Sequence, residues 1–380
     1  MPEDRAYRFL QGRVRKRPLE KDIRIGQLLF NLEYDGGDYV KGYLIPDSFS
    51  NKPVVKVTLD DGSSFLHPCD QFRQAAVDSG RHATGLVGFR IDLNTVPDLA
   101  TQSGLSIHDA DSGLLIYRRP GTRKILDMKM FRIELAMIPA PRLDKQCGHY
   151  FQYAMSGAER FGNETTLQMF HLNAVKSIYV SGRLQLRSYE EFLDKGFMFV
   201  GSIPEPYYEM ASRLFILKRL SREPITFLSD RDHIFLQPAA RHFADVNLRD
   251  EGELKRALKR ADSKVRNVLV SPITRQLVCS DPEQQITRRD ISAAIDAVSR
   301  FTTVGYDNDV GHFHQTISDL LSIPTEELPI TPRYSLLEQI ADRLRTIHIA
   351  EMMLEEDLIF DYYIRKAVTP EPATLMQGAK

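Results

Sequence analysis

The sequence predicts an α/β domain with a mostly parallel sheet covered by helices on both faces, preceded by a small all-β sandwich. Two patterns predict this architecture. Short apolar alternations separated by turn residues run from about residue 23 to 120, and strand-like runs alternate with helical patterns over 125–368. Between them, RRPGTRK (118–124) combines proline, glycine and charge without apolar periodicity, which marks a domain boundary.

Composition and charge narrow the function classes. A chain of 380 residues with 42% apolar and 27% charged residues is long enough for two globular domains. Its 50 basic and 51 acidic residues give a net charge of -1, which lacks the cationic excess of a nucleic-acid binder. An odd number of widely spaced cysteines cannot form a complete disulfide framework, so we expect buried or free thiols at Cys69, Cys147 and Cys279.

The two ends of the chain are predicted to lie outside the folded domains, as an N-terminal tail over 1–22 and a disordered tail over 369–380. The opening lacks the apolar core of a signal peptide, and no apolar run approaches the roughly 18 residues that span a bilayer. We therefore expect a cytoplasmic protein without a transmembrane segment. The basic stretch GRVRKRPLEK (12–21) is either a solvated tail or a contact for a membrane surface or nucleic acid.

The first part contains five strand-like stretches. In VVKVTL, Val55, Val57 and Leu59 alternate with polar residues, and the following DDG predicts a hairpin turn. CDQFRQAAVDSG (69–80) is a short helical or irregular insert. Strands are expected in 26–34, 39–47, 53–66, 86–93 and 112–119.

The second part alternates strands and helices, which favours a largely parallel sheet. Strands are expected in FRIELAMIP (131–139), GFMFVGSIP (196–204), PITFLSD (224–230), VRNVLVSP (265–272) and FTTVGY (301–306). Helices are expected in 148–159, 206–220, 250–267, 286–299, 308–321, 334–348 and 351–367.

Ligands of open α/β sheets bind at the carboxyl ends of strands, so the loops after strands are the places to search. DKQCGH (144–149) lies between a predicted strand and a predicted helix. Gly148 at a helix start would let backbone N–H groups approach an anion, and Lys145 would supply a mobile positive charge. The alternative is a surface loop in which Gly148 only begins a helix.

The second loop is GSIPEPYYEMASRLFILKRL (201–220), where a buried strand ends in a proline-marked turn. Ser212 and Arg213 follow in the predicted helix, and hydroxyl and guanidinium groups there can bind a phosphate. A strand-helix joint that carries an incidental Ser-Arg pair explains the stretch equally well.

Over about residues 130–365 the layout resembles the sulfotransferase family, particularly the branch that modifies carbohydrates. KQCGH is similar to the family's Lys-Thr-Gly-Gly-Thr loop, with Lys145 on the lysine, Gly148 on the second glycine and His149 on the hydroxyl residue. Cys147 replaces the first glycine, and Asp144 stands where the family usually has proline.

The family's Arg-Asp-Pro signature is similar to PEPYYEMAS. Glu205 and Pro206 match the acidic-proline pair and Ser212 matches the serine, whereas Pro204 occupies the arginine's place. Arg213 or Lys218 is the expected substitute. The stretches 294–323 and DLIFDYYIRKA resemble the family's late helix-strand-helix and terminal helix. More weakly, the N-terminal part resembles sandwich modules of bacterial surface-glycan enzymes.

The resemblance implies a sulfotransferase that uses the donor PAPS (3′-phosphoadenosine 5′-phosphosulfate) on a hydroxyl of a bacterial surface polysaccharide or glycolipid precursor. Lys145 would stabilise the transferring group, with Gly148 and His149 in the 5′-phosphosulfate loop and Ser212 and Arg213 at the 3′-phosphate. His171 is the candidate base, with His149 as the alternative.

Two further expectations follow. The expected partners are a nucleotide sulfuryl donor and a carbohydrate acceptor, with no nucleic acid. The HxH pair in VGHFHQ places its histidines on different faces of a helix, so no metal is expected. The divergent motifs keep a second hypothesis open, a catalytically inactive sulfotransferase-like binding or scaffold protein in surface-glycan assembly.

Overall fold

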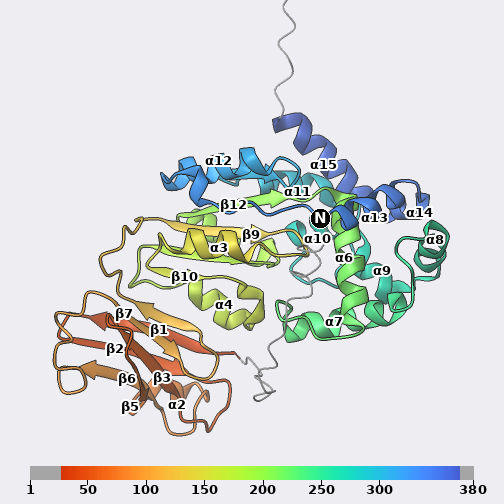
Figure 1. Ribbon diagram of the computed structural model, residues 1–380. Coiled ribbons are helices and arrows are strands. Elements are labelled where there is room, and N and C mark those ends of the chain that lie inside the picture. The colour runs from red at the N-terminus through yellow and green to blue at the C-terminus, as the bar shows by residue number, and fades with distance from the viewer. Residues whose placement is uncertain (1–26, 369–380) are drawn as a thin grey trace, which may run out of the picture. The chain divides into compact units, whose positions relative to one another are not determined.

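The structure is a computed structural model that describes residues 27–368 (Figure 1). The predicted tails 1–22 and 369–380, with the basic stretch 12–21, lie outside the described residues. The described chain forms two compact units. One contains the chain up to Phe131 with Pro141–Gly182 and Phe227–Asp230, and the other contains Arg132–Ala140, Arg183–Thr226 and the chain from Arg231 onward. The predicted domain limits 23–120 and 125–368 stay a prediction.

Two antiparallel four-stranded sheets open the first unit, with orders β1-β2-β6-β5 and β4-β3-β7-β8. Strand β2 alternates buried and half-buried residues along its whole length, as a strand with one covered face should. Phe30, Phe89, Val55 and Ile107 are fully buried. The elements are β1 (Leu29–Asp35), β2 (Tyr39–Ile45), β3 (Val54–Leu59), β4 (Ser64–Pro68), β5 (Gln71–Phe72), α2 (Gln74–Asp78), β6 (Leu86–Asp92), β7 (Leu105–Asp109) and β8 (Leu115–Arg118).

A five-stranded sheet follows, with the order β10-β11-β9-β12-β13. β10 pairs with β11 and β12 pairs with β13 in parallel. The expected α/β class with a parallel sheet is confirmed in this coarse form. The sheet and the chain beside it contain β9 (Lys129–Glu134), α3 (Pro141–Gly148), β10 (Tyr153–Met155), the 3₁₀ turn η1 (Ala158–Arg160), α4 (Asn163–Phe170) and β11 (Ile178–Gly182).

The predicted helix 148–159 is wrong. Phe151, Tyr153 and Met155 are buried while the residues between them are half-buried, so the run has the period of a strand and forms β10. The helix lies one segment earlier, as α3, where Leu143 and Cys147 are buried with helical spacing. DKQCGH is therefore the second half of a helix and the turn after it, not a strand-to-helix loop.

The second unit is mostly helical. Expected strand 196–204 and helix 206–220 are confirmed as β12 and α6. The elements are η2 (Leu186–Ser188), α5 (Glu191–Asp194), β12 (Phe197–Ile203), α6 (Pro206–Leu220), α7 (Asp230–Phe243), α8 (Glu251–Arg260), α9 (Ser263–Leu269), α10 (Pro272–Val278), α11 (Asp290–Ser299), β13 (Thr303–Tyr306), α12 (Val310–Leu321), η3 (Thr325–Glu327), α13 (Ser335–Arg345), α14 (His348–Met353) and α15 (Glu355–Val368).

Two expected strands are wrong. PITFLSD contains no strand. In VRNVLVSP, Val265, Val268 and Leu269 are buried with helical spacing, and the run forms α9, whose first turn is capped by the Asp262 side chain. A short apolar run fits a strand and a buried helix equally well, so periodicity alone could not separate them.

The order of the parallel strands fixes where a ligand is expected. From β9 the chain continues to β10 on one side of the sheet, and from β12 it continues to β13 on the other. Connections from adjacent strands that leave in opposite directions define a topological switch point, and ligands of open α/β sheets bind beyond the carboxyl ends of such strands. In this chain the switch point lies at the ends of β9 and β12, in the second unit.

Candidate functional site

The loop after β9, Leu135–Ala140, is the first segment at the switch point. It contains neither glycine nor any basic or hydroxyl side chain. Its backbone N–H groups at Met137 and Ala140 donate to carboxylates of the protein, at 2.9 Å to Glu209 Oε2 and 3.1 Å to Glu134 Oε2. Two of the backbone donors that could hold an anion at this loop are therefore occupied by carboxylates of the chain.

The helices that begin beyond β12 and β13 are capped in the same way. The Glu205 carboxylate accepts the Tyr208 N–H at 2.7 Å at the start of α6, where Pro206 takes the first helical position. The Asp309 carboxylate accepts the His312 N–H at 3.3 Å at the start of α12. Both helix N-termini, where the macrodipole favours negative charge, hold a carboxylate of the chain itself.

Ser212 and Arg213 were predicted to hold the 3′-phosphate, and both are buried in α6. Ser212 Oγ donates to the Tyr208 carbonyl at 2.8 Å. Arg213 Nε donates to Glu209 Oε1 at 2.7 Å, and its Nη1 donates to the Val268 carbonyl at 3.4 Å. In this arrangement both side chains serve the helix and its core contacts.

Glu209 is fully enclosed between the loop after β9 and the guanidinium of Arg213. Burial raises the pKa of Glu209 to about 7, and the opposing effects of Arg213 and the Met137 N–H do not cancel that increase. The Arg183 guanidinium also secures the loop, because it donates to the Met137 carbonyl at 3.2 Å and pairs with Asp232 at 2.7 Å. The loop is held through both its N–H and C=O groups.

The other predicted site residues lie in the first unit. Lys145 is exposed in the last turn of α3, and Gly148 is the last residue of that helix. Gly148 thus lies at a helix C-terminus, where free carbonyl groups disfavour anions, and the N–H groups of His149 and Tyr150 donate to the Gln146 and Cys147 carbonyls at 3.1 Å. His149 follows on the surface, where burial and the nearby cations Arg123, Lys145 and Arg118 lower its pKa.

His171 is exposed at the end of α4, after the last helical residue. The structure therefore brings Lys145 and His149 close together, and it places Ser212 next to Arg213 along α6. These two groups belong to different units. Their convergence on one nucleotide site, and the roles of Lys145, Gly148, His149, His171, Ser212 and Arg213, stay predictions.

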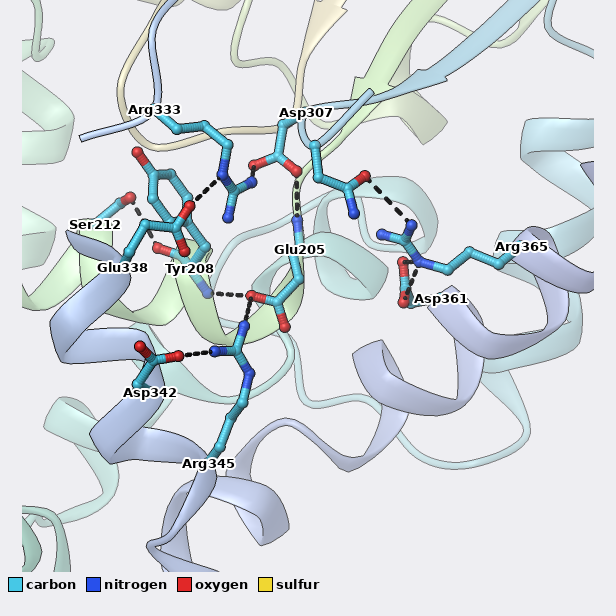
Figure 2. Close-up of polar contacts among 11 residues, drawn as sticks. Glu205, Tyr208, Ser212, Asp307, Arg333, Glu338, Asp342, Arg345, Asp361 and Arg365 are labelled. Carbon is cyan, nitrogen blue, oxygen red and sulfur yellow. Dashed lines mark hydrogen bonds and ion pairs between the residues drawn. The ribbon is translucent and has the colours of Figure 1, made fainter. Parts of the chain in front are cut away.

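An arginine cluster lies beyond the carboxyl ends of β12 and β13 (Figure 2). Arg333 bridges Asp307 at 2.6 Å and Glu338 at 2.5 Å. Arg345 bridges Glu205 at 3.1 Å and Asp342 at 2.5 Å. Arg365 lies against Asp361, with Nε at 2.8 Å and 3.0 Å from the two carboxylate oxygens. We call these three arginines, their five carboxylates and the tyrosines described next the arginine cluster.

Each arginine of the cluster also lies over a tyrosine ring. The distance from guanidinium carbon to ring centroid is 3.8 Å for Arg333 over Tyr208, 4.1 Å for Arg365 over Tyr306 and 5.6 Å for Arg345 over Tyr207. Tyr208 Oη accepts the Tyr334 N–H at 2.9 Å. Cation-π contacts and ion pairs together hold each guanidinium plane in one orientation.

The cluster is locally acidic, since three guanidinium groups face five carboxylates. Burial raises the pKa of Asp307 to about 6, with Arg333 and the Glu205 N–H opposing the increase. Within residues 27–368, the buried Tyr306 Oη and Arg365 Nη2 have no hydrogen-bond partner. The cluster thus combines ordered acceptors with donor capacity that the protein does not use.

Part of this site could be recognised from the sequence. Glu205 is expected both at the opening of a helix and in the acidic-proline pair, and an acidic residue before a proline at the first helical position also indicates a helix cap. Arg333, Arg345 and Arg365 are far from β12 and β13 in sequence, and no spacing rule connects them to Asp307. Only the packing of α13 and α15 beside α6 brings these residues together.

Comparison with known proteins adds no relative. No family model matches the chain, and neither the curated proteins nor the solved structures contain a match.

Among residues 27–368, no helix has the length and apolarity needed to cross a membrane. The same residues contain no group of three or more His, Cys, Asp and Glu side chains that could hold a metal ion. The sulfotransferase resemblance and the PAPS donor that it implies stay predictions.

Proposed function

We propose that this chain is a catalytically inactive, sulfotransferase-like protein that binds a neutral carbohydrate at the arginine cluster. The resemblance suggests glycans of bacterial surface assembly as the ligand class. One observation carries the proposal: the protein's own carboxylates occupy the anion-binding positions at the ends of β9, β12 and β13.

A sulfuryl donor needs the opposite arrangement. Its phosphosulfate and 3′-phosphate require free backbone N–H groups, helix N-termini and unpaired cations. At the switch point the Met137 and Ala140 N–H groups donate to Glu209 and Glu134, and Arg213 forms an ion pair with Glu209. A polyanion would have to displace several buried carboxylates before it could bind, which argues against donor binding there.

A neutral polyol fits the chemistry of the cluster better than an anion does. A sugar hydroxyl both donates and accepts, and the cluster presents carboxylate acceptors next to guanidinium donors. Arg345 and Asp342 are the most accessible of these groups, with 39% and 71% of the side chain exposed. An anionic ligand would be repelled by the excess of carboxylates, whereas an uncharged one would not.

Donor binding is the first test. The full chain would be melted with and without millimolar 3′-phosphoadenosine 5′-phosphate, the spent form of PAPS, and we expect no shift. A ligand at 100 times its dissociation constant would stabilise the fold by about 2.7 kcal/mol. A shift of that size that Lys145→Ala abolishes would overturn the proposal and favour a PAPS-dependent sulfotransferase.

Carbohydrate binding is the second test. An array of neutral, uronic-acid, phosphorylated and sulfated oligosaccharides should retain the protein on neutral members. Arg345→Gln should reduce that binding about tenfold, because it removes an ordered donor and frees two carboxylates. Arg343→Gln is the matched control on the same helix, since Arg343 donates to the Gln339 carbonyl of its own helix. Equal losses of binding in both variants, or no binding to any neutral oligosaccharide, would contradict a carbohydrate site at the arginine cluster.

A further inference from the structure

A second charged region of the same unit lies on α8 and the start of α9. Lys255, Arg256, Lys259 and Arg260 are exposed on α8, and Lys264 is exposed in the first turn of α9. We call these five residues the basic face. We propose that the basic face docks the protein on a membrane surface that contains anionic lipids.

The basic face is concentrated and unpaired. After the acidic first turn of α8, which contains Glu251 and Glu253, residues 254–266 contain six basic side chains and one acidic side chain, a charge of +5 over that stretch. The single acidic residue, Asp262, caps α9 by accepting the Val265 N–H at 2.9 Å. In the part of the chain that the structure describes, none of the five cations has an ion-pair or hydrogen-bond partner.

The helix holds these cations in one place because its other side is anchored. Leu254, Ala257 and Leu258 are buried, and α8 packs against α14. The Asp250 carboxylate caps the N-terminus by accepting the Glu253 N–H at 2.8 Å. Spacings of one and four residues place the four α8 cations on one side of the helix. Figure 1 shows α8 at the rim of its unit, beside α14.

Anionic lipid fits this surface better than nucleic acid does. Clusters of four to eight Lys and Arg on an amphipathic helix bind anionic bilayers by charge, and each cation adds to the attraction. Residues 250–266 contain no aromatic side chain that could stack on a base, and the chain as a whole is not basic. Met352, on the contacting helix α14, has 59% of its surface exposed and offers an apolar contact with the lipid interface.

Vesicle sedimentation tests the proposal with the full chain. The probes are vesicles of phosphatidylcholine alone and vesicles with 30% phosphatidylserine. Binding is measured at roughly 0.05 and 0.3 M salt, because the screening length is longer than about 10 Å at the lower concentration and shorter at the higher one. The variant replaces Lys255, Arg256, Lys259 and Arg260 with Gln. A matched control replaces four scattered exposed cations with Gln, at Lys52, Lys56, Arg289 and Lys366.

We expect binding to the anionic vesicles only, weaker at the higher salt concentration. The α8 variant should lose about 100-fold in affinity, whereas the control should keep most of it, because both change the net charge equally and only one removes the cluster. Circular dichroism melting checks that both variants fold. Absence of binding to anionic vesicles, or equal losses in both variants, would overturn the proposal. So would retention on duplex DNA without binding to vesicles.

Discussion

The arginine cluster and the basic face lie in the same unit and use cations in opposite ways. Each of the three arginines in the cluster is paired with carboxylates and lies over a tyrosine. The five cations of the basic face have no partner among residues 27–368, and four of them project from α8, whose apolar side is buried. One region has internally compensated charge, and the other exposes uncompensated charge to the solvent.

The difference teaches that the number of basic side chains does not identify an anion site. Paired guanidiniums are structural and orienting, because their favourable interactions are already made. Unpaired cations attract an external anionic partner through an electrostatic field that no neighbouring carboxylate cancels. Salt screens that field. Three experiments separate the two regions by their effects on stability.

The largest expected effect comes from Arg333→Met. This change leaves Asp307 largely buried without its ion pair and removes the stacking on Tyr208, so we expect a loss of about 2–3 kcal/mol in the free energy of unfolding. Urea denaturation at pH 7 measures it. Arg343→Met on α13, the helix that follows Arg333, is the control and should cost less than about 0.5 kcal/mol. Similar losses in the two variants would remove the distinction between paired and unpaired arginines.

The next effect depends on pH. The folded-state pKa of Asp307 is raised to about 6 from 3.8, so between these values the folded state binds the proton more tightly than the unfolded state. Its contribution to stability is present at low pH and is lost as pH rises from about 4 to 6. The free energy of unfolding of the wild type, relative to that of Asp307→Asn, should therefore be larger at pH 4 than at pH 7 by on the order of 2 kcal/mol. A pH-independent difference would contradict the raised pKa.

The smallest effect has the opposite sign. Neutralising Lys255, Arg256, Lys259 and Arg260 together should stabilise the fold by up to about 0.5 kcal/mol, because it removes like-charge pairs four residues apart. Thermal melting should show this gain in dilute buffer and not at about 1 M salt. A clear destabilisation would mean that these cations have internal partners, and the contrast with the arginine cluster would fail.

Much of the fold could be predicted from the sequence. The segment 206–220 was assigned correctly as a helix, because proline and acidic residues mark its start. Two short apolar runs were assigned incorrectly. β10 was predicted as helix and α9 as strand, since four to six apolar residues satisfy both periods. β7 was missed although Leu105 and Ile107 alternate with polar Ser106 and His108, because two apolar residues are too short a pattern to predict a strand.

Less of the site could be predicted. The stretch at 205–206 was located correctly beyond a strand, but the loop that follows β9 was placed one helix too late, at 144–149 instead of 135–140. Glu209 and Arg213 are one turn apart and were readable as a helical ion pair. The contact of Glu209 with the Met137 N–H joins positions 72 residues apart, and only the folded sheet sets that distance.

The loop fastened by Glu209 also limits how the protein can change. A single substitution that adds a lysine to Leu135–Ala140 would meet two carboxylates, and a substitution that removes Glu209 would strand the buried Arg213. The added lysine would be neutralised by those carboxylates, and the loss of Glu209 would leave Arg213 without its ion pair, so neither single change produces an anion-binding loop. Arg345 and Asp342 are accessible, so single changes there alter contacts with a ligand and leave the buried pairs around the sheet in place.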